Sequence, residues 1–514
     1  MVPSVINSFP DYHGRYEVGT VDVEIPAANL PAPSASPENA PPTVAFRIFY
    51  PCVQPASGDA NRPVRWISQP QRLTLAALMK FLGMKERMAG LASYLPQHFY
   101  YINLRAHRNA KLLEAPTSNG RWPVTFFSHG LAGSRNAYSY ICGDLASHGM
   151  IVIAMDHRDG SSPVQYVRAT TDTPAHVINA VKISHEPCEE VWQARDRQLR
   201  IRLWEISMAY EALMQIDAGQ AVENLDCNTS NKRQERVEVL WQFDGKLDIH
   251  RAGKVSWAGH SFGAATMTQL VKSIYYSAER PAESGKPLIK PNPDAAVLHQ
   301  IMPESPLLIL DMWGLPLQSP DQAFLWDRPL PAYTTGDPQA VNVLSVLSEG
   351  FFNWKDNTNI NKHIVSGDTG RAQEAAPSTG PKESSGSRMF YVQRSQHFNH
   401  SDFGILFPFL ARRFTKAEEP EWILELNTRA MVQAMREAGI EMVGTDDRDI
   451  LSPTSHIRKW IAIPSDEGND RDRVSGESAL NLLDRKLSLH SMHDTAEPTD
   501  RTSSGEQVQG QLEI

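Results

Sequence analysis

The sequence predicts an α/β fold in which helices cover both faces of a mostly parallel central sheet. Two observations lead to this prediction. Short, continuous apolar runs recur along the chain, which is typical of parallel strands buried on both faces. Segments with helical periodicity separate these runs, so the strands are expected to be joined by helical crossovers.

The predicted elements follow one another from residue 43 onward. The first strand, 43–51, is rich in β-branched and aromatic residues and is expected to stop at Pro51. A Leu-, Ala- and Met-rich stretch at 73–95 predicts one or two helices. Further strands are predicted at 122–130, 150–156, 306–311, 341–347 and in MFYVQ, a strand–turn–helix begins at 254, and helices are predicted at 138–148, 422–438 and around Leu199–Ile216.

One domain is expected to cover residues 1–463. Inside it, residues 366–388 are Gly, Ser, Pro and charged residues with hardly an apolar side chain, so they predict a disordered insertion. The segment 464–514 is equally polar and predicts a disordered tail. A length of 514 residues and a hydrophobic fraction of 41% allow one large core.

Composition argues against several classes of protein. A net charge of −9 supplies no basic field for nucleic acid. The four cysteines have neither CxxC nor zinc-like spacing, so no metal or cofactor is expected from them. The first residues lack the pattern of a secretory signal, and no run of 18 apolar residues occurs. We therefore expect a cytoplasmic protein without a transmembrane segment.

The pentapeptide Gly259-His260-Ser261-Phe262-Gly263 fits the GxSxG pattern of a nucleophile elbow. It lies between an apolar strand and a helical segment, which is the setting that such an elbow requires. The tight turn presents the serine hydroxyl, and the following helix directs N–H groups and its positive dipole end toward developing negative charge. Ser261 is the predicted nucleophile.

A serine nucleophile needs a histidine base, and few histidines follow Ser261 before the tail. His397 and His400 share the segment YVQRSQHFNHSDFG after a short strand. His397 is preferred and His400 is its nearest competitor. His299 comes early, and His363 borders the predicted insertion.

Two carboxylates are candidates for the acid that orients the histidine. Asp311 follows the strand PLLILD and Glu349 follows the next strand, so position alone leaves them nearly equal. The oxyanion donors are expected to be the backbone N–H groups of Leu131 and Phe262. Leu131 lies in the Gly-rich turn HGLAG after an early strand, and Phe262 directly follows the serine.

At these residues the sequence resembles the platelet-activating-factor acetylhydrolases, which have an α/β-hydrolase fold. The resemblance rests on FFSHGLAGSRNAYSYICGDLASHGMIVIAMDHRDGSS (126–162), VSWAGHSFGAAT (255–266), LDMWGLPL (310–317) and SQHFNHSDF (395–403). It implies Ser261 as nucleophile, Asp311 rather than Glu349 as acid, His397 as base and Leu131 and Phe262 as oxyanion amides. It also implies hydrolysis of the short or oxidised sn-2 acyl chain of phospholipids. Because the histidine base and the oxyanion donors would supply the activation, we expect this hydrolysis to be calcium-independent.

Other readings remain open at this point. A general short-chain carboxylesterase or lipase would use the same residues, and a hydrolase-fold scaffold without catalysis would need none of them. The segment 73–95 mixes apolar with basic residues, so it fits either an interfacial helix at a lipid surface or a helix packed on the core.

Overall fold

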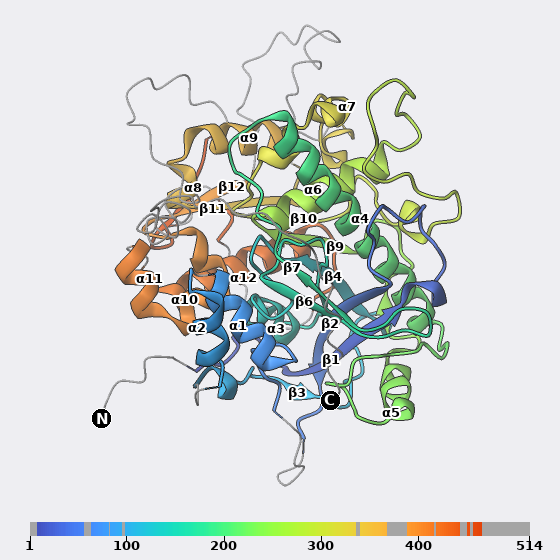
Figure 1. The fold of residues 1–514 in the computed structure, drawn as a ribbon. Helices are drawn as coiled ribbons and strands as arrows, with labels where there is room; N and C mark the ends of the chain where they lie inside the picture. The colour runs from blue at the N-terminus through green and yellow to red at the C-terminus, as the bar shows by residue number, and fades with distance from the viewer. Residues whose placement is uncertain are drawn as a thin grey trace, which may run out of the picture.

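A computed structural model describes residues 8–55, 63–81, 83–94, 98–335, 340–366, 388–415, 418–442, 450–452 and 456–464. Within these residues, eleven strands form one sheet and two form a separate hairpin (Figure 1). The sheet contains β1 Glu17–Pro26, β2 Thr43–Cys52, β3 His107–Arg108, β4 Trp122–Ser128, β5 Ile151–Met155, β8 Leu247–Asp248, β9 Ser256–His260, β10 Leu307–Leu310, β11 Val343–Ser348, β12 Met389–Val392 and β13 Trp460–Ala462. The hairpin is formed by β6 Val164–Val167 and β7 His176–Asn179.

The α-helices of the described residues connect and cover these strands. They are α1 Gln71–Phe81, α2 Glu86–Ala92, α3 Ser139–Ser147, α4 Glu189–Asp217, α5 Arg233–Glu238, α6 Phe262–Tyr275, α7 Ala323–Trp326, α8 Glu349–Phe352, α9 Lys355–Val365, α10 Asp402–Leu406, α11 Pro408–Thr415 and α12 Pro420–Glu437. No helix among the described ranges has the length and apolar content needed to cross a bilayer.

The middle of the sheet is parallel, as predicted. The strand order is β13-β12-β11-β10-β9-β4-β5-β2-β1-β3, with β8 paired to β4. Between β12 and β5 in this order, every pair of neighbouring strands is parallel. The pairs β12–β13, β5–β2 and β2–β1 are antiparallel. Because β4, β9, β10 and β11 are parallel neighbours, their carboxyl ends open on the same edge of the sheet.

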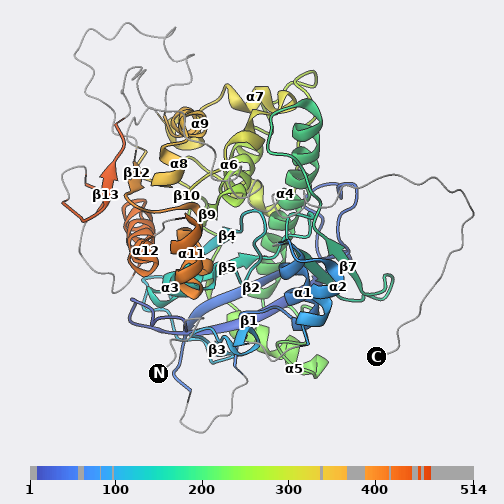
Figure 2. The ribbon, with the colours of Figure 1, turned by 60° about the vertical axis from the view of Figure 1, so that its left-hand side comes forward.

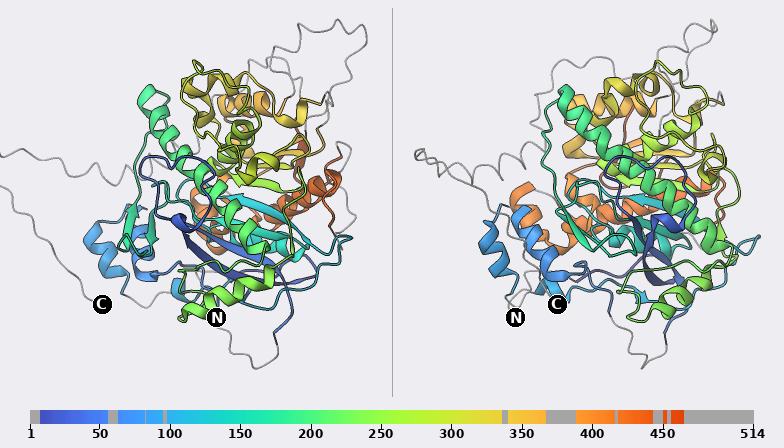
Figure 3. Two further views of the ribbon diagram at one scale, coloured as in Figure 1. Left: turned by 90° about the vertical axis from the view of Figure 1, so that its right-hand side faces the viewer. Right: turned by 45° about the vertical axis from the view of Figure 1, so that its right-hand side comes forward.

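Alternating side chains of the strands feed two apolar cores, one on each face. Phe126 belongs to one core and Phe127 to the other. Helices α4 and α6 cover the first face, and α3 and α12 cover the second (Figure 2). The long helix α4 lies across its face of the sheet (Figure 3). Helices thus cover both faces of a mostly parallel sheet, and a sharp strand-to-helix turn of the nucleophile-elbow type follows β9. This arrangement is an α/β-hydrolase fold.

Two sequence expectations need correction. Pro51 does not end the first strand but lies inside β2, beyond the segment Phe46–Phe49 that pairs with β5. The sequence pattern also predicts no strand before residue 43, yet β1 pairs along the whole length of β2. β1 is not an apolar run, because it carries acidic residues such as Asp22, which is buried against Arg47 at 2.7 Å.

The other predicted elements are present with small shifts of their ends. The segment 73–95 forms two helices, α1 and α2. The predicted disordered insertion 366–388 lies outside the described residues apart from Ser366 and Arg388, and the predicted tail lies outside them apart from Pro464.

Candidate active site

Ser261 occupies the turn between β9 and α6 in a strained backbone conformation. Its φ of 57° and ψ of −121° lie in a region that side chains other than glycine rarely adopt. The Ser261 N–H donates to the Leu310 carbonyl at 2.9 Å, and the Ser261 carbonyl accepts from the backbone N–H of Trp313 at 3.3 Å. The neighbouring strand β10 therefore holds the turn in place and keeps the hydroxyl at the sheet edge.

The glycines on each side of Ser261 allow three chain segments to meet. A Cβ on Gly259 would lie 2.4 Å from the Gly263 oxygen, and a Cβ on Gly263 would lie 2.0 Å from the Ser128 oxygen. Both distances are far shorter than van der Waals contact, so larger residues would push β4, β9 and α6 apart. The GxSxG spacing is therefore a packing requirement of this turn.

His397 bridges Ser261 and Asp311. Its Nε2 lies 2.9 Å from Ser261 Oγ, and its Nδ1 lies 2.7 Å from Asp311 Oδ2. The imidazole stacks on Phe351, with ring centres 4.2 Å apart and planes at 6°, and the tilted ring of His260 lies 4.4 Å away. Its side chain is 12% exposed. The ring is thus held in one plane while one edge stays open to the surface.

Asp311 follows β10 and is fully buried. Besides His397, it accepts hydrogen bonds from the Ser348 N–H at 2.7 Å and the Ser348 hydroxyl at 2.8 Å. Burial by itself would raise the pKa of Asp311, but the hydrogen bond from His397 and the other donors outweigh it, and the pKa is lowered. A carboxylate held ionised in this way orients the imidazole and stabilises its protonated form.

The competing candidates lie elsewhere. Glu349 begins α8, and its carboxylate accepts from the Arg394 N–H at 2.9 Å rather than from His397. His400 is fully buried, its Nδ1 lies 2.9 Å from Asn427 Nδ2, and burial lowers its pKa to about 4. His363 stacks on Trp326.

The predicted oxyanion donors flank the serine on two chain segments. Phe262 is the first residue of α6, and Leu131 belongs to the turn after β4. The turn is close to the nucleophile, because a Cβ on Gly130 would lie 2.9 Å from the Ser261 Cβ. Tyr138 fixes this approach: its hydroxyl accepts from the Gly130 N–H at 3.2 Å and lies 2.7 Å from His260 Nδ1.

Several residues around the site were not identified from the sequence. Ser348 orients Asp311, Phe351 supports His397, and Tyr138 ties the HGLAG turn to His260. Only Tyr138 carries a sequence signal, since it lies in the stretch 126–162 on which the family resemblance rests. The other two come from strands and helices whose arrangement is visible only in the folded chain.

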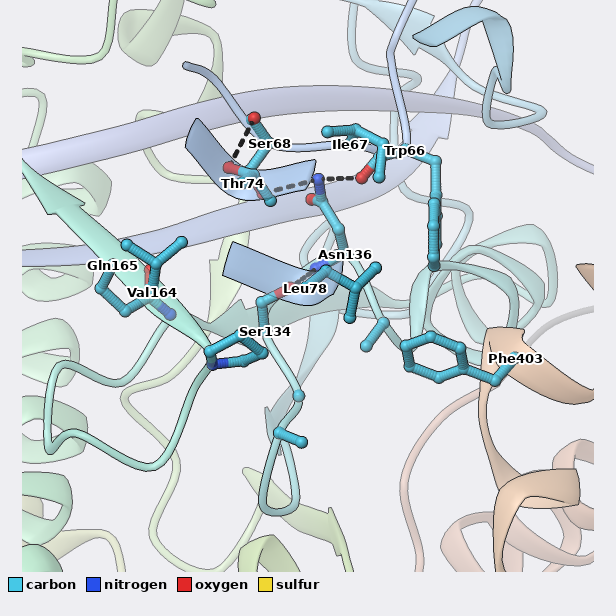
Figure 4. Close-up of a pocket in the computed structure, with 14 residues that line it drawn as sticks. Trp66, Ile67, Ser68, Thr74, Leu78, Ser134, Asn136, Val164, Gln165 and Phe403 are labelled. Carbon is cyan, nitrogen blue, oxygen red and sulfur yellow. Dashed lines mark hydrogen bonds between the residues drawn. The ribbon is translucent and has the colours of Figure 1, made fainter. Parts of the chain in front are cut away.

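A cavity of about 60 Å³ lies beside the HGLAG turn (Figure 4). Trp66, Leu78 of α1, Val164 and Phe403 supply apolar walls, and Asn136 supplies a polar one. A water molecule needs about 10–15 Å³ of such space, so the cavity has room for a few water molecules, and neither Ser261 nor His397 is among the residues that line it. Ala132 and Gly133 join this cavity to the turn that carries Leu131.

His260, Asp311 and His397 place one potential metal-ligand atom each within 4.8 Å of one another. Each of these groups already has a partner: both His397 nitrogens contact the other two members of the Ser–His–Asp cluster, and His260 Nδ1 contacts Tyr138. Burial and the neighbouring His397 also lower the pKa of His260 far below its usual value. His397 and Asp311 therefore belong to the hydrogen-bonded cluster with Ser261, and His260 packs beside it.

Comparison with known proteins agrees with this architecture. Residues 2–449 match the family described as platelet-activating factor acetylhydrolase, isoform II. A Schizosaccharomyces pombe protein named "Putative phospholipase A2" is 28% identical over 473 residues, covering 88% of this chain and 97% of the relative. Platelet-activating factor acetylhydrolases of guinea pig (Cavia porcellus) and dog (Canis lupus familiaris) are 32% and 28% identical, but these alignments cover about half of each chain. The chain belongs to the platelet-activating factor acetylhydrolase isoform II family.

Proposed function

We propose that this carboxylic ester hydrolase cleaves the short or oxidised sn-2 acyl ester of phospholipids through an acyl-Ser261 intermediate. The observation that carries the proposal is the continuous hydrogen-bonded path from Ser261 through His397 to the buried Asp311. Family membership supports phospholipid ester hydrolysis.

In the acylation step, His397 Nε2 removes the Ser261 proton as Oγ attacks the sn-2 carbonyl carbon. The carbonyl oxygen becomes an oxyanion, which the N–H groups of Leu131 and Phe262 stabilise. The tetrahedral intermediate collapses when the protonated His397 gives its proton to the sn-2 oxygen of the departing lysophospholipid. Asp311 keeps Nδ1 protonated throughout, so the ring presents Nε2 to the hydroxyl.

In the deacylation step, water takes the place of the lysophospholipid. His397 removes a proton from the water as it attacks the acyl-Ser261 carbonyl, and it returns that proton to Ser261 Oγ when the carboxylic acid leaves. The base and the oxyanion donors supply the activation, so we expect hydrolysis to continue at an unchanged rate in excess EDTA, without calcium.

A substrate panel tests the function. Purified chain should hydrolyse phosphatidylcholines with a 2-acetyl or other short sn-2 chain at least about 100-fold faster than those with a 16-carbon chain, measured as kcat/KM. Equal rates across chain lengths, or hydrolysis of p-nitrophenyl acetate alone, would favour the general carboxylesterase instead. A chain that hydrolyses no ester and resists fluorophosphonate labelling would be the non-catalytic scaffold.

A lipid surface is the proposed place of action, and the support is a group of exposed apolar side chains. Met88 and Leu91 of α2 are 59% and 72% exposed, and Phe409 of α11 is 71% exposed. The ring centres of Phe99 and Phe407 lie 5.5 Å apart. This contact links the segment after α2 to the residue before α11. Exposed basic residues, Lys85, Arg87, Arg412 and Arg413, flank these apolar side chains.

The double variant Met88→Ser/Leu91→Ser tests this surface. We expect it to bind anionic phospholipid vesicles about tenfold more weakly, because two apolar side chains no longer enter the interface. Its activity on a water-soluble ester should stay unchanged. Trp241→Ser is a matched control, since Trp241 is 47% exposed on a different segment. Equal vesicle binding by the double variant and the wild type would contradict the proposed surface.

We also propose that residues 1–463 act as one catalytic domain and that the protein works in the cytoplasm. The support for the first proposal is that β1 and β13, near the two ends of this range, belong to one sheet. The support for the second is that all four cysteines are free, and two of them, Cys188 and Cys227, are exposed.

A further inference from the structure

The direction of the Leu131 N–H depends on the orientation of one peptide unit, the one that joins Gly130 to Leu131. In a trans peptide, the carbonyl of Gly130 and the N–H of Leu131 lie in one plane and point in opposite directions. A group that holds the Gly130 oxygen therefore also sets the direction of the Leu131 N–H. Glycine at 130 leaves this plane free to rotate unless something holds it.

The side chain of His129 holds the Gly130 oxygen. Its Nδ1 lies 2.9 Å from the Gly130 oxygen, which also accepts from the Gly133 N–H at 3.2 Å. Its Nε2 lies 3.1 Å from the backbone nitrogen of His157. The His129 ring is almost completely buried, with 1% exposure.

These two contacts define a single tautomer of His129. A carbonyl oxygen only accepts hydrogen bonds, so Nδ1 must carry the proton that reaches Gly130. A backbone N–H only donates, so Nε2 must be bare to accept from His157. Burial and the nearby Arg202 lower the pKa of His129 to about 4, which is consistent with a neutral ring at physiological pH.

Arg202, fully buried in α4, holds the other side of the same turn. Its Nη1 donates to the His129 carbonyl at 2.7 Å, and its Nε donates to Asp159 at 2.6 Å. The guanidinium also lies 4.4 Å from the ring centre of Phe262, the residue that supplies the second proposed oxyanion donor. The two donor segments are therefore anchored to one side chain.

We propose that His129 is a positioning residue, whose Nδ1–H fixes the Gly130–Leu131 peptide plane so that the Leu131 N–H points at the developing oxyanion. This inference rests on the proposed esterase function. It assigns His129 no proton transfer, which belongs to His397. The effect of His129 should therefore appear in stabilisation of the transition state and not in substrate binding.

Asparagine and leucine at position 129 separate a positioning role from simple packing, because the two side chains have nearly the same shape. The Asn Nδ2 lies as many bonds from Cα as the histidine Nδ1 and offers an N–H donor, whereas leucine offers a methyl group. Purified full-length His129→Leu should lose about 10²- to 10³-fold in kcat on a soluble acetyl ester, as expected for loss of one oxyanion donor. Its KM should stay within about threefold of the wild-type value, and His129→Asn should recover at least tenfold of the lost kcat.

A trifluoromethyl ketone provides the second readout, because its adduct with serine carries an oxyanion. Inhibition by this ketone should weaken in His129→Leu by about the same factor as kcat. His363→Leu is the control, since His363 is a partly buried histidine that contacts the Trp326 carbonyl away from the site. Wild-type kcat in a folded His129→Leu, or equal losses in folded Leu and Asn variants, would overturn the proposal.

A crystal structure of the wild-type chain with the same ketone decides the matter even if the variants do not fold. The proposal expects the oxyanion within about 3.1 Å of the Leu131 nitrogen while His129 Nδ1 keeps its contact with the Gly130 oxygen. An oxyanion directed away from Leu131, or a rotated Gly130 carbonyl, would contradict it. Failure of the proposed function is distinguishable, because wild-type chain would then neither hydrolyse the ester nor form the adduct.

Discussion

Two Ser–His–acid clusters with the same order of hydrogen bonds occur among the described residues, but they differ in access and in backbone conformation. In the first, His397 lies 2.9 Å from Ser261 and 2.7 Å from Asp311. The second, which we call the buried cluster, consists of Ser128, His157 and Glu205. Distances alone do not distinguish them, because both contacts of the histidine in the buried cluster measure 2.9 Å.

Access and backbone conformation separate the two clusters. His397 keeps 12% of its side chain exposed, whereas His157 has none exposed. Ser261 occupies the strained turn before α6, whereas Ser128 is the last residue of β4, within the sheet. A substrate carbonyl approaching the sheet edge therefore reaches Ser261, and Ser128 lies behind the turn that would hold the oxyanion.

The charge of the acid also differs. The pKa of Asp311 is lowered, because the hydrogen bonds from His397 and Ser348 outweigh the effect of burial. Burial raises the pKa of Glu205 well above its usual value, and the nearby Asp159 raises it further. An ionised acid stabilises a protonated histidine, and a neutral one does not. We therefore expect catalysis to need an accessible base and a charged acid in addition to a hydrogen-bonded triplet.

Exchanging the two serines tests the comparison with the largest expected effect. Ser261→Ala should lower kcat by about 10⁴- to 10⁶-fold and abolish labelling by a fluorophosphonate, because the attacking oxygen is gone. Ser128→Ala should keep full labelling and lose less than about tenfold in kcat. Stoichiometric labelling of Ser261→Ala would show that another residue, with Ser128 the first suspect, is the nucleophile.

Replacing the two acids by their amides should give a smaller but clear contrast. Asp311→Asn should lower kcat by about 10⁴-fold, since an amide cannot hold the same histidine tautomer or stabilise its charge. Glu205→Gln should change kcat by less than about threefold, because Glu205 contacts His157 of the buried cluster and an amide of the same shape replaces it. Comparable losses in the two variants, measured on one soluble ester, would mean that the buried cluster takes part in the chemistry.

The pH dependence of stability should give the smallest effect, and it depends on the sign of each pKa shift. Glu205 has a raised folded-state pKa, so its stabilising contribution is complete below the unfolded value of about 4.3 and is lost as the pH rises toward the folded value. Glutamine has no proton to lose. Between pH 5 and 8, the free energy of unfolding of the wild type should therefore fall relative to that of Glu205→Gln.

Asp311→Asn is the matched comparison for this measurement. The lowered pKa of Asp311 means that its contribution is present above about pH 3.9 and is lost only at lower pH. In a His397→Gln background, where the neighbouring imidazole is absent, the difference in unfolding free energy made by Asp311→Asn should therefore stay constant from pH 5 to 8 in urea titrations. A constant difference for Glu205→Gln as well would contradict a neutral Glu205.

Local patterns in the sequence were sufficient to predict the parallel centre of the sheet and the turn at Ser261. The apolar runs at 122–130, 150–156, 254–263, 306–311 and 341–347 became β4, β5, β9, β10 and β11. Glycines at 259 and 263 predicted the turn because their spacing around a serine, between a strand and a helix, is a local pattern, although the contact that requires Gly263 is with Ser128 of the distant strand β4. β1 could not be predicted in this way, because its acidic residues are buried together with arginines on other segments of the chain. Asp22, for example, pairs with Arg47 of β2.

Local sequence alone predicts the turn at Ser261, the proposed nucleophile, because that turn depends on a strand, a tight turn and a helix that are contiguous. It left Asp311 and Glu349 nearly equal, and only the family resemblance favoured one. The tertiary structure decided which acid meets His397, since that contact joins residues 86 positions apart. It also placed Ser128, His157 and Glu205 in a second triplet that no local pattern indicates. Contacts between distant segments depend on how the strands are ordered in the sheet, and that order is set by packing of the whole chain.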